Sequence, residues 1–436
     1  MGWVIGLLPF VLLCLGVPIY LIFFATAIVA LWDKGIPPTM LPQNIFGSID
    51  SFTLLAVPFF IFAGEIMGRG GIAVRLVDWV MKMFGGVRGS LAMVTVASCE
   101  LFGTMSGSSS ATVAAIGRLM YPALRKQGYE EEFSLGLVTS TGAIATVIPP
   151  SILMILYGAS AEVSVAKLFL GGFLPGILIG LLMVIYIVWY ARRRNIQSLD
   201  RFHLATFVRA TVNTIWALGV PLVILGGIYG LPAVRIGALE FGGKAIFTPT
   251  EAAGVAGIYG IAVSLLIYKD IGWKGVWEVA VNSGIVTAQL MIIVAASAVF
   301  SWILTVTGVP QAITDFIQSL GAPRWGVLLA INIFLIIVGC LIDPTSATLV
   351  LTPLLLPLVK AVGVDPVHFG IILTVNLSMG MFTPPFGLNI FLAQSLFGAP
   401  TSKIYPGLVP FIALQIVALM IITYVPEISL FLPRLL

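Results

Sequence analysis

The sequence predicts an all-α polytopic membrane protein built from inverted repeats, and three observations support this fold class. Hydrophobic residues make up 59% of the 436 positions and charged residues only 9%, with a mean hydropathy of +1.10. A water-soluble domain of this length would need far more charge on its surface. Apolar segments of about 20 residues, long enough to cross a ~30 Å hydrocarbon core, recur along the chain. In addition, the two halves of the sequence resemble each other.

The apolar segments divide into full crossings and hairpins. We expect full crossings at 3–31, 46–67, 133–157, 166–190, 211–230, 250–268, 278–306, 366–392 and 405–427. The stretches 89–127 and 323–360 are too long for one crossing, and a small polar cluster interrupts each, so we expect two re-entrant helical hairpins. A short amphipathic segment precedes each hairpin, at 72–84 and 309–320. The first apolar segment has no basic start, which favours a retained helix over a cleaved signal peptide.

The distribution of basic residues sets the predicted orientation. If the hairpin 89–127 opens to the cytoplasm, seven of the 22 Lys and Arg residues lie outside and the other 15 inside. The seven are Lys34, Lys167, Arg235, Lys244, Arg324, Lys360 and Arg434. The positive-inside rule therefore places the N-terminus in the cytoplasm and the C-terminus in the periplasm. Because the net charge of +4 comes largely from these loops, we expect no nucleic-acid partner.

The sequence does not favour an enzyme. Cys14, Cys99 and Cys340 all lie in apolar stretches, where they act as small buried hydrophobes, and His203 and His368 are the only histidines. An intramembrane hydrolase could use a serine of "GSSS", but no Lys or His on a neighbouring apolar segment is placed to activate it. We therefore expect no catalytic residues.

The repeat is visible when the chain is shifted by 236 positions. "GTMSGSSSATVAA" from Gly103 then lies over "GCLIDPTSATLVL" from Gly339. The pair Pro149-Pro150 matches Pro384-Pro385 at an offset of 235. Each half contains a crossing helix, an amphipathic segment, a hairpin, a Pro-interrupted helix and a closing helix. The predicted crossings start the halves on opposite sides of the membrane, so the repeats are inverted, as in many secondary transporters.

The polar run "SGSSS" is explained by a hairpin tip. Non-helical backbone at membrane depth is tolerated only where protein buries it or where it lines a cavity. The Pro-Pro pairs interrupt the neighbouring helices and should leave carbonyls unbonded near 145–148 and 380–383. Such oxygens suit a hard cation such as Na⁺, and half-helix N-termini suit an anion. We expect both tips and both broken helices to meet near the membrane midplane.

Several residues keep two interpretations. The small residues of "SGSSSAT" could instead serve close helix packing. Asp343 in "DPT" is either a helix N-cap or a cation ligand. Glu65 either forms a local pair near a helix end or relays protons. Arg118 either extends to the membrane interface or pairs with substrate.

Five stretches then carry a family resemblance: "DSFTLLAVPFFIFAGEIMGRGGIAVRLVD", "LFGTMSGSSSATVAAIG", "IPPSILMILYGASAEVSVAKLFLGGFLPGIL", "IFTPTEAAGVAGIYG" and "DPVHFGIILTVNLSMGMFTPPFGLNIF". They resemble the large membrane subunit of the tripartite ATP-independent periplasmic (TRAP) transporters over nearly the whole chain. The resemblance implies an elevator-type fold of the ion-transporter superfamily. It also implies Na⁺-driven uptake of a small organic anion, a carboxylate or sulfonate, across the bacterial inner membrane.

The resemblance further implies two partners beside the membrane lipid. A soluble periplasmic binding protein would deliver the anion, and a separate small membrane subunit of four helices would complete the permease. The alternative is a Na⁺/anion symporter of the same superfamily that works without a binding protein. This chain departs from the family at Arg118, where a small or apolar residue is usual, and in the inserted "LPAVRIGALEFGGKA".

Site residues follow from matching the family's motifs, and they include at least two Na⁺ sites. The first Na⁺ site would use Ser106, Ser108, Ser110, Thr112, Thr141, Gly142, Thr146 and Val147. The second would use Asp343, Thr345, Ser346, Thr348, Gly380 and Thr383. The substrate would contact Ser109, Asn376, Asn389, Pro150 and Pro385. Arg118, where the chain departs from the family, is a further candidate for substrate contact and does not follow from the motif match.

The expected organisation has a moving block and a scaffold. The block comprises 89–165 and 323–393, each a hairpin with its broken helix. The scaffold comprises 1–88 and 166–322, which include the amphipathic arms, and the C-terminal helix in 394–436. We expect loops 32–45, 158–165, 231–249 and 307–322 to face the periplasm.

Overall fold

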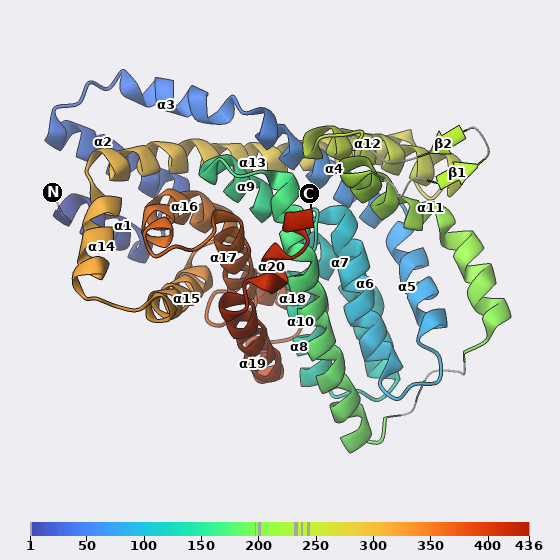
Figure 1. The fold of residues 1–436 in the computed structure, drawn as a ribbon. Coiled ribbons are helices and arrows are strands. Elements are labelled where there is room, and N and C mark those ends of the chain that lie inside the picture. Colours follow the sequence, from blue (N-terminus) through green and yellow to red (C-terminus); the bar gives the residue numbers. More distant parts are fainter. Residues whose placement is uncertain are drawn as a thin grey trace.

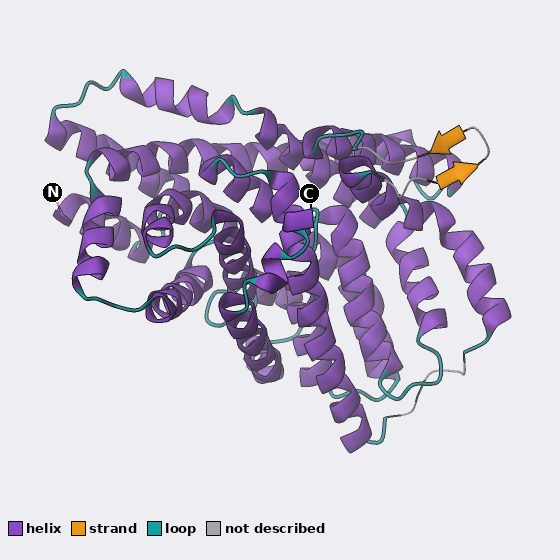
Figure 2. Cartoon of the chain, viewed as in Figure 1, coloured by secondary structure: helices purple, strands orange, loops and turns teal. Residues whose placement is uncertain are grey.

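The computed structural model describes residues 2–196, 198, 202–230, 234–236, 239–241 and 245–435, and within these ranges the chain is nearly all helical. The described strands are β1 (Val234–Ile236) and β2 (Leu239–Phe241), a small antiparallel hairpin at one edge of the molecule (Figure 2). Among the described residues, this hairpin is the one departure from the all-α expectation. Eight of the described helices are long and apolar enough to cross a membrane.

The first half of the chain follows the predicted order of elements. It contains α3 (Met40–Ile49), η1 (Phe52–Leu55), α4 (Ala56–Arg69), α5 (Ile72–Met83), α6 (Ser90–Ser106), α7 (Ser109–Lys126), α8 (Glu131–Ile144), α9 (Ile152–Ala161) and α10 (Val165–Arg193). The helices α6 and α7 pack against each other as a hairpin, and α8 and α9 are the two parts of a broken helix. The amphipathic α5 is the predicted arm.

The rest of the chain repeats this order. It contains α11 (Leu204–Tyr229), α12 (Pro249–Ala262), η2 (Val263–Ile267), α13 (Trp273–Val306), α14 (Val309–Ser319), α15 (Arg324–Leu341), α16 (Pro344–Ala361), α17 (Pro366–Gly380), α18 (Leu388–Phe397), α19 (Thr401–Tyr424), α20 (Glu427–Leu430) and η3 (Pro433–Leu435). The elements α14 to α19 start within about two residues of α5 to α10 shifted by 235 or 236 positions. The repeat is therefore confirmed in the order and length of the helices.

The prediction of one continuous crossing over 3–31 is wrong. The structure has two helices there, α1 (Gly2–Cys14) and α2 (Ile19–Lys34), which pack against each other. The chain turns at Gly16, whose φ is +74°, and Pro18 precedes the first residue of α2. A left-handed residue and a residue without an N–H stop a helix whatever the hydropathy of its neighbours.

The two Pro-interrupted helices are broken as predicted. Pro149-Pro150 and Pro384-Pro385 each lie between the two parts of a broken helix, and both are cis. After the first break, Ser151 is the N-cap of α9. Its hydroxyl accepts from the Met154 N–H at 3.4 Å and donates to the Thr146 carbonyl. The segments 133–157 and 366–392 are thus pairs of short helices.

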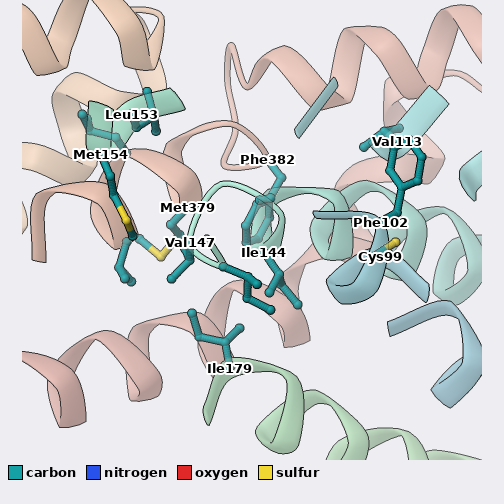
Figure 3. Packing of buried hydrophobic residues seen from close by; sticks show 14 of the residues in the cluster. Cys99, Phe102, Val113, Ile144, Val147, Leu153, Met154, Ile179, Met379 and Phe382 are labelled. Atoms are coloured by element: carbon teal, nitrogen blue, oxygen red, sulfur yellow. The ribbon is translucent and has the colours of Figure 1, made fainter. Parts of the chain in front are cut away.

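Hairpin and broken helix pack in the same way in both halves. A Cβ on Gly103 would lie 2.7 Å from Ala145 Cα, and one on the equivalent Gly339 would lie 3.4 Å from the Cα of Gly380. Close backbone approach at these positions joins the first arm of each hairpin to the break beside it. Side chains of the first hairpin and of both broken helices then share one apolar core, seen in Figure 3 around Phe102, Ile144 and Phe382.

The remaining helices surround this core. The long α13 runs across the molecule and contacts α2, α3, α4 and α16 (Figure 1). On the other side α11 packs against α5 and α12, and α10 packs against α19 and α6. The arrangement leaves both hairpins beside α4 and α13, where a cavity of about 730 Å³ lies.

Candidate functional site

Both hairpin tips and both helix breaks meet at one cavity of about 730 Å³. The first tip contributes 106–111 and the second contributes 343–345. Thr146 and Ile152 come from the first broken helix, and Met381 and Leu388 from the second. The helices α4, α5 and α13 complete the wall. Elements more than 200 residues apart in sequence therefore form a single site.

The first tip is a tight turn that only glycine fits. Gly107 ends α6 with φ +57°, and a Cβ there would lie 2.4 Å from the Pro150 carbonyl oxygen. Ser108 then caps α7, because its hydroxyl accepts from the Ala111 N–H at 3.4 Å. The same hydroxyl lies 3.3 Å from that of Ser110. The tip thus gathers several hydroxyl oxygens beside the first break.

The second tip is closed by Asp343. Its carboxylate accepts from the Ser346 N–H at 3.0 Å and also from the Ser346 hydroxyl, and Pro344 occupies the first helical position. The N-cap interpretation of Asp343 is therefore confirmed. Asp343 and Thr345 also line the cavity, so the cation-ligand interpretation stays a prediction.

Hydrogen bonds cross between the halves at this site. The Ser109 hydroxyl lies 3.1 Å from Asn389 Oδ1 and 2.8 Å from Asn389 Nδ2. The Asn389 amide also donates to the Thr139 carbonyl at 3.0 Å. A second hydrogen bond between the halves joins the Thr146 and Ser378 hydroxyls. The first tip is therefore bonded to the second broken helix.

Only part of the predicted site lies on the cavity wall. The predicted residues on the wall are Ser106, Ser108, Ser109, Ser110, Arg118, Thr146, Asp343 and Thr345. The other predicted residues do not line the cavity: Thr112, Thr141, Gly142, Val147, Ser346, Thr348, Gly380, Thr383, Asn376, Asn389, Pro150 and Pro385. Thr112 and Asn389 still touch wall residues, at Ser106 and Ser109 respectively.

Asn376 and Pro385 lie farthest from the expectation. The Asn376 amide donates to Asn332 Oδ1 at 2.9 Å and to the Ile372 carbonyl at 2.8 Å, between α17 and α15. Pro385 is exposed, and its carbonyl accepts from the Tyr405 hydroxyl at 3.1 Å. Neither residue lines the cavity in this conformation.

Two of the backbone carbonyls expected to be free are bonded within the protein. The Thr146 carbonyl accepts from the Ser151 hydroxyl, and the Met381 carbonyl accepts from the Asn389 N–H at 2.8 Å. Buried acceptors are rarely left without a donor, and each break supplies one from the start of the next helix.

The charged wall formed by α4 was missed by the sequence analysis. Glu65 pairs with Arg69 at 2.9 Å and accepts from the Ser283 hydroxyl at 3.0 Å. The local-pair interpretation of Glu65 is thus confirmed, but both residues also line the cavity. The spacing of four residues between Glu65 and Arg69 predicts their ion pair on one helix. It does not predict that this face of α4 meets the hairpin tip.

The side-chain oxygens available to a cation belong to residues that line the cavity: the hydroxyls of the first tip and of Thr345, and the Asp343 carboxylate. These are hard oxygen ligands, the type that Na⁺ and similar cations prefer. The same cavity receives the N-terminal ends of half-helices, whose amide groups favour anions. The chemistry of the site therefore suits a cation and an anion side by side.

Comparison with known sequences covers nearly the whole chain. The family model described as "Tripartite ATP-independent periplasmic transporter, DctM component" matches residues 6–428. The isethionate TRAP transporter permease protein DctMQ of Oleidesulfovibrio alaskensis is 39% identical, over 96% of this chain and 64% of that protein. The C4-dicarboxylate large permease DctM of Pseudomonas aeruginosa is 38% identical over 90% of this chain and 88% of its own. The ectoine/5-hydroxyectoine large permease UehC of Ruegeria pomeroyi is 38% identical over 99% and 98%.

Solved structures share the fold at low sequence identity. The YdaH transporter of Alcanivorax borkumensis superposes with a TM-score of 0.61 at 15% identity, covering 88% of this chain and 86% of its own. MtrF of Neisseria gonorrhoeae gives 0.57 at 15% identity, with 88% and 82% covered. These two likenesses concern the fold alone. With the family model matching almost end to end and the relatives named above, this multi-pass membrane chain belongs to the DctM family, the large permease component of TRAP transporters.

Proposed function

We propose that this chain is the permease of a Na⁺-coupled uptake system of the bacterial inner membrane. It moves a small organic anion that a periplasmic binding protein delivers, with a small four-helix subunit as its membrane partner. The observation that carries the proposal is the single cavity to which both hairpin tips and both broken helices contribute. In the orientation that the positive-inside rule predicts, the N-terminus is cytoplasmic and the C-terminus is periplasmic.

The half-helix ends support an anionic substrate. Ser109, Ile152, Pro344 and Leu388 are the first residues of α7, α9, α16 and α18, and all four line the cavity. The N-terminus of a helix carries partial positive charge, so four such ends around one space favour a negative ligand. The names of the relatives include a C4-dicarboxylate, isethionate and ectoine, which all carry a carboxylate or sulfonate.

The oxygen donors support Na⁺ as the coupling ion. Ser108 and Ser110 at the first tip and Asp343 and Thr345 at the second place hydroxyls and a carboxylate on the wall. Asp343 is the only one of these four residues that can titrate, so proton coupling has few groups to use. We therefore assign one Na⁺ to each tip.

Hydrogen bonding between the two halves supports movement of the hairpins as one block. The Ser109–Asn389 contact joins 89–165 to 323–393, so these segments travel as one elevator body. The scaffold of 1–88, 166–322 and 394–436 surrounds it, and α5 and α14 are the arms between the two. Alternating access then needs only the block to slide along α4 and α13.

Transport in proteoliposomes tests the coupling. The chain, its small subunit and its binding protein are reconstituted, and either a Na⁺ gradient or a pH gradient is imposed. Uptake should follow the Na⁺ gradient, and Ser108→Ala and Thr345→Ala should each weaken Na⁺ activation. Ser319→Ala, at an exposed hydroxyl of α14, is the matched control. Uptake that follows the pH gradient at zero Na⁺ gradient would overturn the proposal.

Repeating the transport experiment without the binding protein distinguishes the proposed function from a Na⁺/anion symporter that needs no binding protein. If the remaining membrane complex takes up free substrate at the full rate, the chain is a symporter that needs no delivery. The Na⁺ sites would be shared by both, so the Na⁺ experiment does not distinguish them.

A further inference from the structure

One charge on the cavity wall is unlike the others. The charged residues that line the cavity are Glu65, Arg69, Arg118 and Asp343. Glu65 and Arg69 form an ion pair, and Asp343 is held by the backbone and hydroxyl of Ser346. Arg118 is exposed, and in the part of the chain that the structure describes it has no acidic partner. The cavity therefore presents one uncompensated guanidinium.

We propose that Arg118 is a specificity-determining residue that binds the carboxylate or sulfonate of the substrate. The inference rests on the proposed function, since it needs the cavity to be the substrate site. It deepens that function by naming the residue that binds the charged group: the small organic anion has one charged end on Arg118 and a second polar end at the hairpin tips.

The geometry of α7 fits such a two-ended ligand. Ser109 begins this helix and Arg118 lies nine residues later, so their Cα atoms are about 13 Å apart along the axis. Long side chains on a helix lean toward its N-terminus, which brings the guanidinium back toward the tip. The remaining gap suits a molecule of a few carbon atoms. A guanidinium binds carboxylates and sulfonates through two parallel N–H donors, which fixes their orientation.

The repeat separates Arg118 from the ion machinery. At an offset of 236, the tip residues Ser110 and Thr112 correspond to Ser346 and Thr348, so hydroxyls occur in both halves. Arg118 corresponds to Leu354, a partly buried residue packed against the apolar core. Duplicated oxygens fit two equivalent ion sites. A charge present in only one half fits a ligand present in one copy, which is the substrate.

The alternative is that Arg118 only reaches toward the lipid headgroups. In that case Arg118→Lys would behave like the native chain, and Arg118→Ala would slow uptake of every substrate equally without changing affinity. The substrate-binding role predicts instead a change in affinity that lysine repairs only in part, because an ammonium lacks the fork geometry.

Binding from inside the vesicle tests the proposal most directly. Succinate, isethionate and ectoine are the probes, first in thermal stabilisation of the purified chain in Na⁺ and then as internal inhibitors of uptake in proteoliposomes. The variants are Arg118→Ala, Arg118→Gln and Arg118→Lys. Arg192→Ala is the control, since Arg192 is also exposed but lies in the last turn of α10 and does not line the cavity.

For a probe that stabilises the native chain, Arg118→Ala and Arg118→Gln should raise the half-inhibitory concentration at least about tenfold, as loss of a charged hydrogen bond predicts. Arg118→Lys should lie between, and Arg192→Ala should match the native chain. Na⁺ activation should stay unchanged in all of them.

Three results would overturn the inference. One is an Arg118→Ala variant that keeps the native half-inhibitory concentration within about twofold. Another is an Arg118→Lys variant that equals the native chain for every probe. The third is a native chain that none of the three probes stabilises, which removes the substrate class. Failure of the proposed function has a different signature, namely anion binding that depends on Arg118 without Na⁺-driven uptake.

Discussion

Gly64 sets how closely the scaffold approaches the first hairpin tip. A Cβ at this position would lie 2.8 Å from Ser106 Cβ and 2.9 Å from Ser106 Cα. We predict that Gly64→Ala pushes the tip away from α4, lowers the free energy of unfolding by about 1–3 kcal/mol, and slows uptake several-fold. Both can be measured, by thermal unfolding and by uptake per amount of folded protein.

Gly68, one turn along α4, is the matched control for this substitution. Its Cβ would meet Phe102 Cζ at 3.5 Å and Ala115 Cβ at 3.9 Å, which is ordinary contact. Gly68→Ala should therefore behave like the native chain. Equal effects of the two substitutions would show that α4 tolerates the tip at a greater distance.

Asp343 permits a separation of its two interpretations. Asparagine caps a helix as well as aspartate, whereas alanine loses the cap at a cost of about 1 kcal/mol. We predict that Asp343→Asn keeps the thermal stability of the native chain but raises the Na⁺ concentration for half-maximal uptake at least about tenfold. Asp343→Ala should lose both. Native Na⁺ activation in Asp343→Asn would leave Asp343 as a cap only.

At the residue scale the sequence predicts caps better than long-range contacts. Asp343 before Pro344 is a local signal for the start of a helix, and the structure has that cap. The Ser109–Asn389 contact joins residues 280 positions apart, and no local pattern encodes which hydroxyl meets which amide. The wall residue Arg69 was likewise visible only as a helix-end charge.

At the scale of elements, α4 and α7 can be joined to test whether the hairpin moves. The position of a Cβ on Gly68 is 3.9 Å from Ala115 Cβ, close to the separation of about 3.8 Å in disulfides. We predict that Gly68→Cys with Ala115→Cys, oxidised, abolishes uptake and that a reductant restores it. Cys14 is exposed, not buried as expected from the sequence, and is replaced beforehand so that it forms no other bridge.

Each single cysteine variant serves as the control for that pair, since neither can form the bridge. The degree of bridging is measured by the mobility of the protein before and after reduction. Full uptake by fully bridged protein would contradict an elevator and favour a rocking or channel mechanism.

The order of elements was predictable because three signals coincided. Apolar length gave the long helices α10, α11 and α13, amphipathic period gave α5 and α14, and the repeat gave the hairpins. The break between α1 and α2 was missed because the apolar content of 3–31 outweighed the local signal of Gly16 and Pro18. The strands β1 and β2 lie in the inserted segment, where short alternating residues give no reliable period.

Whether each hairpin turns back within the membrane stays a prediction. The two helices of the second hairpin, α15 and α16, have 18 residues each and by length and composition could cross the membrane. In the first hairpin, α6 has only 17 residues. Apolar length alone therefore does not distinguish a re-entrant hairpin from two crossings, and the inverted repeat is the stronger argument for it.

At the scale of the whole molecule, we predict that the chain alone transports free substrate negligibly. Its long apolar helices expose side chains such as Trp216, Ile258 and Trp277, which need lipid or a membrane partner to cover them. Adding the small subunit and the binding protein should restore Na⁺-driven uptake in proteoliposomes. Uptake at the full rate by the chain alone would refute the tripartite assembly.

The insertion is the proposed docking element for the binding protein. Its charged residues Arg235, Glu240 and Lys244 lie outside the described side chains, so their role stays a prediction from sequence. Deleting Leu231 to Ala245 should reduce uptake at limiting binding-protein concentration but leave uptake unchanged at saturating concentration. Uptake by the native chain at limiting concentration should fall as the salt concentration rises. Unchanged uptake at limiting concentration would make this segment a solvated loop only.

If Ser109 binds the substrate as predicted, its hydrogen bond with Asn389 couples ligand binding to protein conformation. Ser109 lines the cavity, and its hydroxyl is hydrogen-bonded to Asn389 at the second broken helix. A ligand that takes this hydroxyl competes with Asn389 for it, and so weakens one tie between the two halves of the repeat. Thermodynamic reciprocity requires that a rearrangement which frees Ser109 tightens ligand binding by the same factor. Ligand binding in the cavity and loss of the Ser109–Asn389 hydrogen bond between the repeats would therefore favour each other.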